Sequence, residues 1–350
     1  MIIGITPVRI SFAGGGTDLP EYYNQFNGNV VSTTINQFTY AIVHPSKDNL
    51  FQVFSPDLKK HFTSKFFGKI AVEDGNEIAS STIKYLKYKT GINTILFSDV
   101  AAGSGLGGSS SLMVNLLNTL LFSKREKWNK TKLAETAYFI ARNILHWPLG
   151  RQDEYITSFG GFNHIKFSKQ KTTVSPIKLN NSTKKELESN LLLFFMGTTR
   201  KSAEILIDQI KRINDKDPQT ISALHSTNDL GILTYESLKN SDIEKFAELL
   251  NEGWNLKRKF STKVSNPKID RLYKKAFMLG ASGGKLTGAG GGGHLLLYCE
   301  KNKQKKIINY MESKGLKQVK FEFYNSGPKV LDIEKYISKG KINKKQILNL

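Results

Sequence analysis

Residues 103–111 of this 350-residue chain read GSGLGGSSS and combine four glycines with four serines. Closely spaced glycines let backbone amides approach an anion, and a helix that follows adds unpaired N–H groups and the positive end of its dipole. The hydroxyls of Ser109, Ser110 and Ser111 can bind phosphate oxygens or a cation. The pattern therefore favours a loop that binds a polyphosphate.

Three other interpretations of this loop can be tested against the neighbouring sequence: a dinucleotide-binding loop, a Walker-type loop and a flexible turn. Residues 103–108 fit the G-x-G-x-x-G pattern of dinucleotide-binding folds, and Glu126 lies near the distance of the ribose-binding acid. However, residues 112–125 form one continuous helical pattern, with no strand before Glu126. A Walker-type loop requires a lysine after the glycines, and none follows here. A flexible turn with a serine N-cap stays open.

Two further stretches carry glycine beside reactive groups. In TPVRISFAGGGTDLP (6–20) a strand pattern ends in three glycines, and Asp18 follows, whose carboxylate can accept two hydrogen bonds from neighbouring sugar hydroxyls. Arg9 alternates with Ile10 on that strand, so it faces either a polar cleft or the surface. GGKLTGAGGGGH (283–294) has seven glycines in twelve residues, which favours close packing against a ligand or another glycine loop.

The elements that position these residues follow from hydrophobic periodicity. We expect a sheet from strands at 2–12, 29–34, 40–44 and 51–55, and later strands at 94–99, 161–167, 191–195 and 318–324. Helices are expected at 77–90, 112–125, 132–145, 268–279 and 303–314, with two or three more in 202–262. The polar stretch 178–190 is the expected domain boundary.

Composition limits the class of protein. The net charge of +21 comes from 51 Lys and Arg against 30 Asp and Glu, and much of the excess is lysine in segments such as 301–306 and 339–346. We interpret it as a solvated face and expect no nucleic-acid partner, because no zinc spacing or ribonucleoprotein signature accompanies the charge. No apolar stretch is long enough to span a membrane, no secretory leader is recognisable, and Cys299 is the single cysteine. A cytoplasmic protein without a membrane partner is expected.

The three glycine-rich stretches, in this order and at this spacing, resemble the three motifs of the GHMP kinases. The middle motif of that superfamily, P-x-x-x-G-L-G-S-S-A, wraps the phosphates of ATP, and GSGLGGSSS occupies its place. RISFAGGGTDLP, GRQDEYITSFGGFNHI (150–165) and MGTTRKSAEIL (196–206) look most like the bacterial D-glycero-D-manno-heptose 7-phosphate kinases, and L-fucokinases share part of the pattern.

The resemblance implies a two-domain α+β fold, with a ribosomal S5 domain 2-like N-terminal domain and a ferredoxin-like C-terminal domain. We expect the ATP-binding domain at 1–185, the C-terminal domain at 186–335 and a basic tail at 336–350. The implied activity is transfer of phosphate from ATP to the anomeric hydroxyl of a heptose 7-phosphate, with Mg²⁺ as a cofactor. A homodimer is left open.

The resemblance also implies roles for individual residues. Asp153 orients or deprotonates the sugar hydroxyl, with Glu154 as its neighbouring competitor, and Arg9 stabilises the transferred charge. Arg200 is expected either to bind the phosphate of the acceptor or to be a solvent-exposed arginine at a helix start. The ATP loop comprises Gly103, Ser104, Gly105, Leu106, Gly107, Gly108, Ser109, Ser110 and Ser111. The remaining expected substrate contacts are Gly16, Thr17, Asp18, Gly288, Gly290 and Gly291, and the expected metal ligands are Ser109 and Asp153.

Two positions depart from the family pattern. Ala141 stands where family members commonly carry a magnesium-binding glutamate, and Gly108 stands where the first serine of the Ser-Ser pair is usual. Two alternatives therefore stay open. One is a kinase for an unphosphorylated sugar such as L-fucose or galactose, and the other is a catalytically weak protein of this fold that binds its ligands without turnover.

Overall fold

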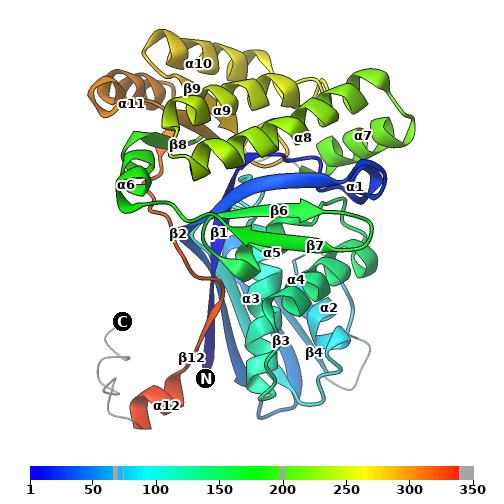
Figure 1. Cartoon of the computed structure of the whole chain (residues 1–350). Coiled ribbons are helices and arrows are strands. Elements are labelled where there is room, and N and C mark those ends of the chain that lie inside the picture. The colour runs from blue at the N-terminus through cyan, green and yellow to red at the C-terminus, as the bar shows by residue number, and fades with distance from the viewer. Residues whose placement is uncertain (66–69, 74, 198–201, 339–350) are drawn as a thin grey trace.

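The computed structural model describes residues 1–65, 70–73, 75–197 and 202–338, which form two sheets with helices packed around them (Figure 1). The larger sheet has the strand order β12-β1-β2-β5-β3-β4, with β6 and β7 joined to it through β2. The smaller sheet has the order β11-β8-β10-β9. The predicted two-domain α+β fold is confirmed, whereas the domain bounds 1–185 and 186–335 stay a prediction.

The strands of the larger sheet are β1 (Ile2–Ala13), β2 (Gly28–Pro45), β3 (Leu50–Ser55), β4 (Lys60–Lys65), β5 (Ile92–Ser98), β6 (Asn163–Phe167), β7 (Thr172–Pro176) and β12 (Lys329–Asp332). Those of the smaller sheet are β8 (Leu191–Phe195), β9 (Gly283–Leu286), β10 (His294–Tyr298) and β11 (Lys317–Gln318). The expected strands at 29–34 and 40–44 are one long strand, β2, which pairs with β1 along most of its length.

The helices are α1 (Pro20–Phe26), α2 (Glu77–Tyr85), α3 (Gly108–Ser123), α4 (Lys130–Phe139), α5 (Gln152–Phe159), α6 (Asn181–Asn190), α7 (Ser202–Asn214), α8 (Pro218–Lys239), α9 (Ile243–Lys257), α10 (Pro267–Met278), α11 (Gln304–Ser313) and α12 (Ile333–Ser338). Short helical turns are η1 (Pro56–Leu58), the π-helix η2 (Ile140–Ile144) and η3 (Lys301–Lys303). The region 202–262 thus contains three helices, α7 to α9, as expected.

The expected strand at 318–324 is wrong. Its backbone divides its hydrogen bonds between the two sheets: the Val319 N–H donates to Leu193 O, whereas Phe323 bridges Ile35 of β2. No ladder can extend along a segment that leaves one sheet for the other. The chain then reaches β12, which pairs antiparallel with β1, so its last strand lies in the larger sheet (Figure 1).

One hydrophobic core joins the two halves. Buried Phe12 of β1 meets Phe246 of α9 edge to face, with ring centroids 5.1 Å apart. The same cluster includes Leu193 of β8 and Leu230 of α8. Because burial of apolar surface in a shared core resists separation, the residues at the junction of the two halves hold a fixed arrangement.

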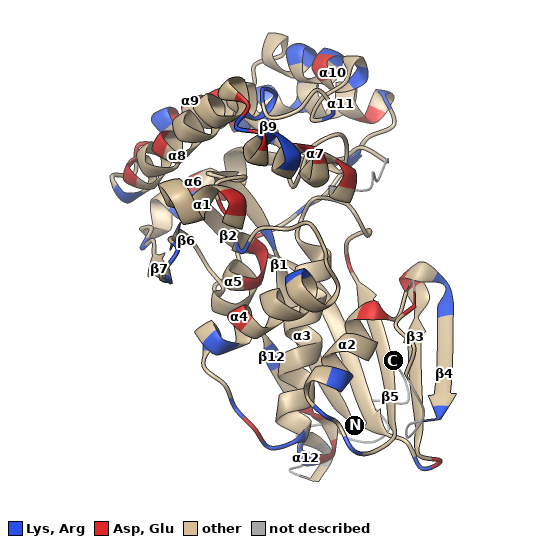
Figure 2. Cartoon of the chain, turned by 90° about the vertical axis from the view of Figure 1, so that its right-hand side faces the viewer, with Lys and Arg blue, Asp and Glu red and all other residues tan. Residues whose placement is uncertain are grey.

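Lys and Arg positions are spread over many elements of the ribbon rather than gathered on one (Figure 2). This distribution agrees with the interpretation of the net charge as a solvated surface. In the part of the chain that the structure describes, no helix has the length and apolar character needed to cross a membrane.

Candidate active site

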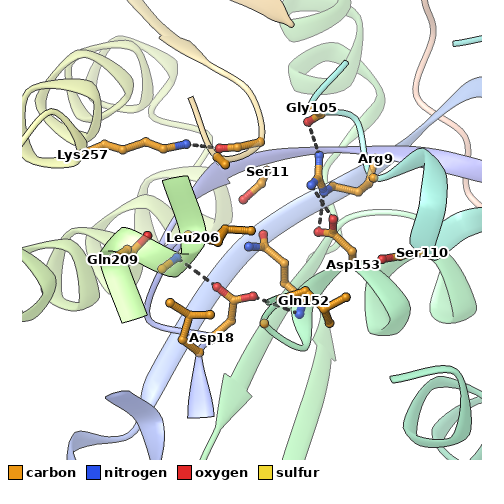
Figure 3. A pocket seen from close by; sticks show the side chains of 18 of the residues that line it. Arg9, Ser11, Asp18, Gly105, Ser110, Gln152, Asp153, Leu206, Gln209 and Lys257 are labelled. Atoms are coloured by element: carbon orange, nitrogen blue, oxygen red, sulfur yellow. Dashed lines mark hydrogen bonds and ion pairs between the residues drawn. The ribbon is translucent and has the colours of Figure 1, made fainter. Parts of the chain in front are cut away.

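A cavity of about 580 Å³ lies where the two halves meet (Figure 3). The larger-sheet half contributes the end of β1, the turn 14–19, the loop before α3 and the segment 147–153. The other half contributes residues of α7, α8 and α9 and the stretch 285–289. The cavity therefore brings together all three glycine-rich stretches, which are far apart in the chain.

Arg9 and Asp153 meet in this cavity. Arg9 Nε donates to Asp153 Oδ1 at 2.7 Å, and Nη2 donates to Oδ2 at 2.6 Å. The remaining nitrogen, Nη1, donates to Gly105 O at 2.5 Å, and the Arg9 backbone N–H donates to Leu106 O. Arg9 is 4 % exposed. Of the two orientations that strand alternation left open, Arg9 takes the one that faces the cleft. One arginine therefore links the proposed base to the glycine loop.

The glycine loop needs glycine for its backbone. Gly103, Gly105 and Gly107 have φ of 70°, 81° and 74°, in the left-handed region where side chains are strained. Helix α3 begins at Gly108, earlier than expected, so the three serines lie in its first turn. Ser109 and Ser110 line the cavity. The first-turn amides of a helix have no partner inside the helix and are available to an anion.

Two members of the expected ATP loop point elsewhere. Leu106 is fully buried in the core. Ser111 Oγ donates to Pro7 O at 3.0 Å and pairs with Thr39 Oγ1 at 2.9 Å, which fixes α3 to the strands beneath it. Leu106 and Ser111 therefore hold the loop in place, whereas residues 103–105 and 107–110 line the cavity.

The third glycine-rich stretch packs directly on this loop. A Cβ atom on Gly288 would lie 2.4 Å from Gly105 Cα, and one on Gly293 would lie 2.4 Å from Ser104 O. His294 Nδ1 lies 2.8 Å from the same Ser104 oxygen. Gly288 lines the cavity, whereas Gly290 and Gly291 pack against Val264.

Asp18 lies at the other end of the cavity and is 3 % exposed. Its carboxylate accepts the Gly16 N–H at 2.9 Å and the Gln152 N–H at 3.2 Å. Burial raises the pKa of Asp18, and the hydrogen bond from Gly16 opposes that rise. Gly16 also lines the cavity, but Thr17 is fully buried and donates to Gly14 O, so it shapes the turn.

The structure separates Asp153 from its neighbour Glu154. Asp153 lines the cavity, whereas Glu154 is fully buried behind it and is absent from the lining. Burial and the nearby charge of Asp153 raise the pKa of Glu154 to about 8. Because Asp153 lines the cavity and Glu154 does not, Asp153 is the carboxylate that can contact a ligand there.

The oxygen donors beside the loop are few. Among the described residues, no group of three or more His, Cys, Asp or Glu side chains could hold a metal ion. Ala141 is buried and does not line the cavity, and Glu135 is engaged by Arg151 at 3.1 Å. The oxygen donors that line the cavity at the loop are the carboxylate of Asp153 and, among the described serines, the hydroxyls of Ser104, Ser109 and Ser110.

Two lysines in the wall of the cavity were not predicted from the sequence as site residues. Lys285 Nζ donates to Phe12 O at 2.7 Å, and Lys257 Nζ donates to Gly288 O. Burial lowers the pKa of Lys257 to about 8 and that of Lys285 well below its usual value. Lys285 belongs to the stretch GGKLTGAGGGGH and could have been noticed there, but Lys257 is one of many helix lysines and carries no distinguishing signal.

Three lining side chains have buried polar atoms without a partner in the described residues: Ser11 Oγ, Gln152 Oε1 and Gln209 Nε2. Unpaired buried polar atoms are costly unless a ligand or water satisfies them. Arg200 lies outside the described residues.

The chain matches known proteins over nearly its whole length. The model of the GHMP kinases N-terminal domain matches residues 77–161, and that of the GHMP kinases C-terminal region matches 234–317. D-glycero-alpha-D-manno-heptose 7-phosphate kinase of Campylobacter jejuni is 30% identical, over 93% of this chain and 97% of the relative. A galactokinase of Pyrococcus furiosus is 26% identical over 86% of this chain and 90% of the relative.

Solved structures agree on the fold. A D-glycero-D-manno-heptose 1-phosphate kinase from Bacteroides thetaiotaomicron superposes with a TM-score of 0.80 at 22% identity, covering 95% of this chain and 99% of the other. Together with the geometry of the cavity, these matches establish that the chain belongs to the GHMP kinase family, whose members use ATP to phosphorylate an alcohol group.

Proposed function

We propose that this kinase transfers the γ-phosphoryl group of ATP to the anomeric hydroxyl of D-glycero-D-manno-heptose 7-phosphate, giving the 1,7-bisphosphate. The relative from Campylobacter jejuni, which carries that name at 30% identity, supports the choice of acceptor. The observation that carries the reaction is the Arg9–Asp153 pair, which lies between the glycine loop and the Asp18 end of the cavity.

The chain's residues divide the work of the transfer. The amides at the start of α3 and the loop 103–110 bind the phosphates of ATP. Asp153 accepts the proton of the sugar hydroxyl. As the proton leaves, the hydroxyl oxygen of the sugar forms a bond to the γ-phosphorus of ATP, while the bond from the γ-phosphorus to the β-phosphate oxygen breaks and ADP leaves. Arg9 holds Asp153 in place and offsets charge on the transferred group.

The acceptor end of the cavity suits a molecule with several hydroxyl groups. Asp18 offers a carboxylate, and the unpaired atoms of Ser11, Gln152 and Gln209 supply two acceptors and an amide donor, the serine hydroxyl also being able to donate. A sugar would satisfy these atoms, whereas an apolar alcohol would leave them unpaired. Arg200 remains a proposed contact of the acceptor phosphate.

The oxygen donors beside the loop are sufficient for a Mg²⁺ ion that enters the site bound to ATP. This ion keeps several waters and needs only one or two protein oxygens beside the phosphates. Ser109 and Asp153 are the proposed ligands, with Ser110 beside them. When bound, the ion neutralises phosphate charge. Both Asp153 oxygens accept from Arg9, so Ser109 is the less encumbered of the two.

The test is release of ADP from ATP with heptose 7-phosphate, L-fucose, galactose and mannose as acceptors. We expect turnover with heptose 7-phosphate to exceed that with the other sugars by at least about 100-fold in kcat/KM. Preference for L-fucose or galactose would replace the proposed acceptor. Absence of turnover with every sugar, in a folded protein that binds ATP, would favour a binding protein.

A further inference from the structure

Lys257 and Lys285 bring two amines to one wall of the cavity, from the end of α9 and from β9. Among the described residues each amine has one hydrogen-bond acceptor, Gly288 O for Lys257 and Phe12 O for Lys285. An ammonium group has three N–H donors. Each lysine therefore keeps donors available beyond its carbonyl contact.

The charges of these lysines are only partly balanced by the protein: burial and the charge of Arg9 lower the pKa of Lys257, and the nearby charges of Asp18 and Asp153 oppose that fall. In the ranges that the structure describes, neither lysine forms an ion pair, while the charge of Arg9 is matched by Asp153. The nearby charge of Lys257 lowers the pKa of Lys285, after the larger effect of burial. Like charges held close together in a largely buried wall favour the neutral amine, and an anion that joins them favours the charged form.

We propose that Lys257 and Lys285 bind the phosphate group that the acceptor sugar carries before the reaction. This inference rests on the proposed function for the identity of the acceptor. A phosphate monoester offers two negative charges and three terminal oxygens, which can accept hydrogen bonds from both amines and favour their charged form against the effect of burial.

The position of the lysines favours the acceptor over ATP as the source of that phosphate. ATP phosphates have their own donors at the loop and at the start of α3, where Ser110 lies. Figure 3 shows Lys257 on the opposite side of the cavity from Ser110, with Ser11 and Leu206 between them. Lys285 is held by Phe12, just before the glycine turn that carries Asp18. Lys285 thus flanks the region assigned to the sugar. Lys257 lies between that region and the glycine loop, because its carbonyl partner Gly288 packs on Gly105.

The experiment compares Lys257→Met and Lys285→Met with the intact protein, using D-glycero-D-manno-heptose with and without its 7-phosphate. Methionine keeps an unbranched side chain and removes the charge. We expect KM for the phosphorylated heptose to rise about 10- to 100-fold in each variant, the range of a charge-assisted hydrogen bond. KM for ATP and for the unphosphorylated heptose should change less than about 3-fold.

Two control variants sharpen the comparison. Lys259→Met removes the same charge from an exposed position two residues away, and its kinetic constants should match those of the intact protein. Lys257→Arg keeps a cation and should recover most of the lost affinity. Melting temperatures of all variants check folding. A parallel rise in KM for ATP, or equal effects on both forms of heptose, would overturn the inference.

A binding measurement separates this inference from the proposed function. If the intact protein does not turn over heptose 7-phosphate, the proposed function fails. Calorimetry then titrates inorganic phosphate into protein whose ATP site is filled with a non-hydrolysable analogue. Phosphate binding that both methionine variants lose would support the anion site, and binding that they retain would contradict it.

Discussion

Arg9 and Asp153, separated by 144 residues in the chain, share two hydrogen bonds of 2.7 and 2.6 Å in the cavity. The third nitrogen of the same guanidinium binds Gly105 O in the glycine loop. A planar fork of this kind cannot be replaced by a single ammonium group. The positions of the proposed base and of the phosphate loop are therefore coupled through one side chain.

The proposed role of Asp153 is tested by Asp153→Asn, which keeps the shape of the side chain and removes its capacity to accept a proton. We expect kcat to fall by about 10²- to 10⁴-fold. Affinity for ATP in the absence of Mg²⁺, measured by calorimetry, should change little because the glycine loop is intact. A variant that retains more than about a tenth of kcat would exclude Asp153 as the base.

The close contact between the glycine loop and the third glycine stretch is tested by Gly105→Ala. Gly105 has φ of 81°, and a Cβ atom there would lie 2.6 Å from Thr287 O. We expect a loss of unfolding free energy of about 1–3 kcal/mol and a weaker ATP complex. Thermal melts and ATP titrations measure both.

Gly108→Ser is the matched control for that substitution, because the nearest atom to its Cβ would be Val100 Cγ2 at an ordinary 3.6 Å. It also restores the serine that is usual in the family. We expect stability to change by less than about 0.5 kcal/mol. Equal destabilisation by the two substitutions would show that packing against Thr287 does not set the requirement for glycine.

The buried carboxyl of Glu154 should make stability depend on pH. Its pKa is raised to about 8 by burial first and by Asp153 second, from an ordinary value of 4.5. Between these values the folded protein binds the proton more tightly than the unfolded chain, so this group's contribution is fully present below pH 4.5 and is lost as pH rises through 8.

Replacement of Glu154 by glutamine removes that titration. We expect Glu154→Gln to gain on the order of 2–4 kcal/mol relative to the intact protein when the pH is raised from 5 to 8.5. Chemical denaturation at both pH values gives the difference. A constant difference across this range would mean that Glu154 does not titrate there in the folded protein.

The lysine wall predicts a pH dependence for the acceptor. Burial lowers the pKa of Lys257 to about 8, so its amine is charged below that pH and neutral above it. We expect kcat/KM for heptose 7-phosphate to fall above pH 8, and the apparent pKa of this fall to rise in Lys257→Arg. The unphosphorylated heptose serves as the reference, and an identical fall for both acceptors would rule out Lys257 as the cause.

Local pattern was sufficient for much of the fold and part of the site. The alternation along residues 2–12 left Arg9 facing either a cleft or the surface, and the three glycine stretches favoured close backbone packing before any contact was known. Local pattern could not show that residues 318–324 do not form one strand. Its apolar residues suit a strand, yet its hydrogen-bond partners belong to two different sheets.

Residue type and spacing by themselves indicated the three glycine-rich stretches, and their resemblance to a known family implied the role proposed for Asp153. Tertiary structure alone decided which polar residues of those motifs face the cavity: Thr17 and Ser111 bind backbone carbonyls, whereas Ser109 and Asp18 line the cavity. It also brought Lys257 and Lys285 together, 28 positions apart on a helix and a strand. The physical reason is that a side chain's partners and charge balance arise from long-range packing, which no short window of sequence contains.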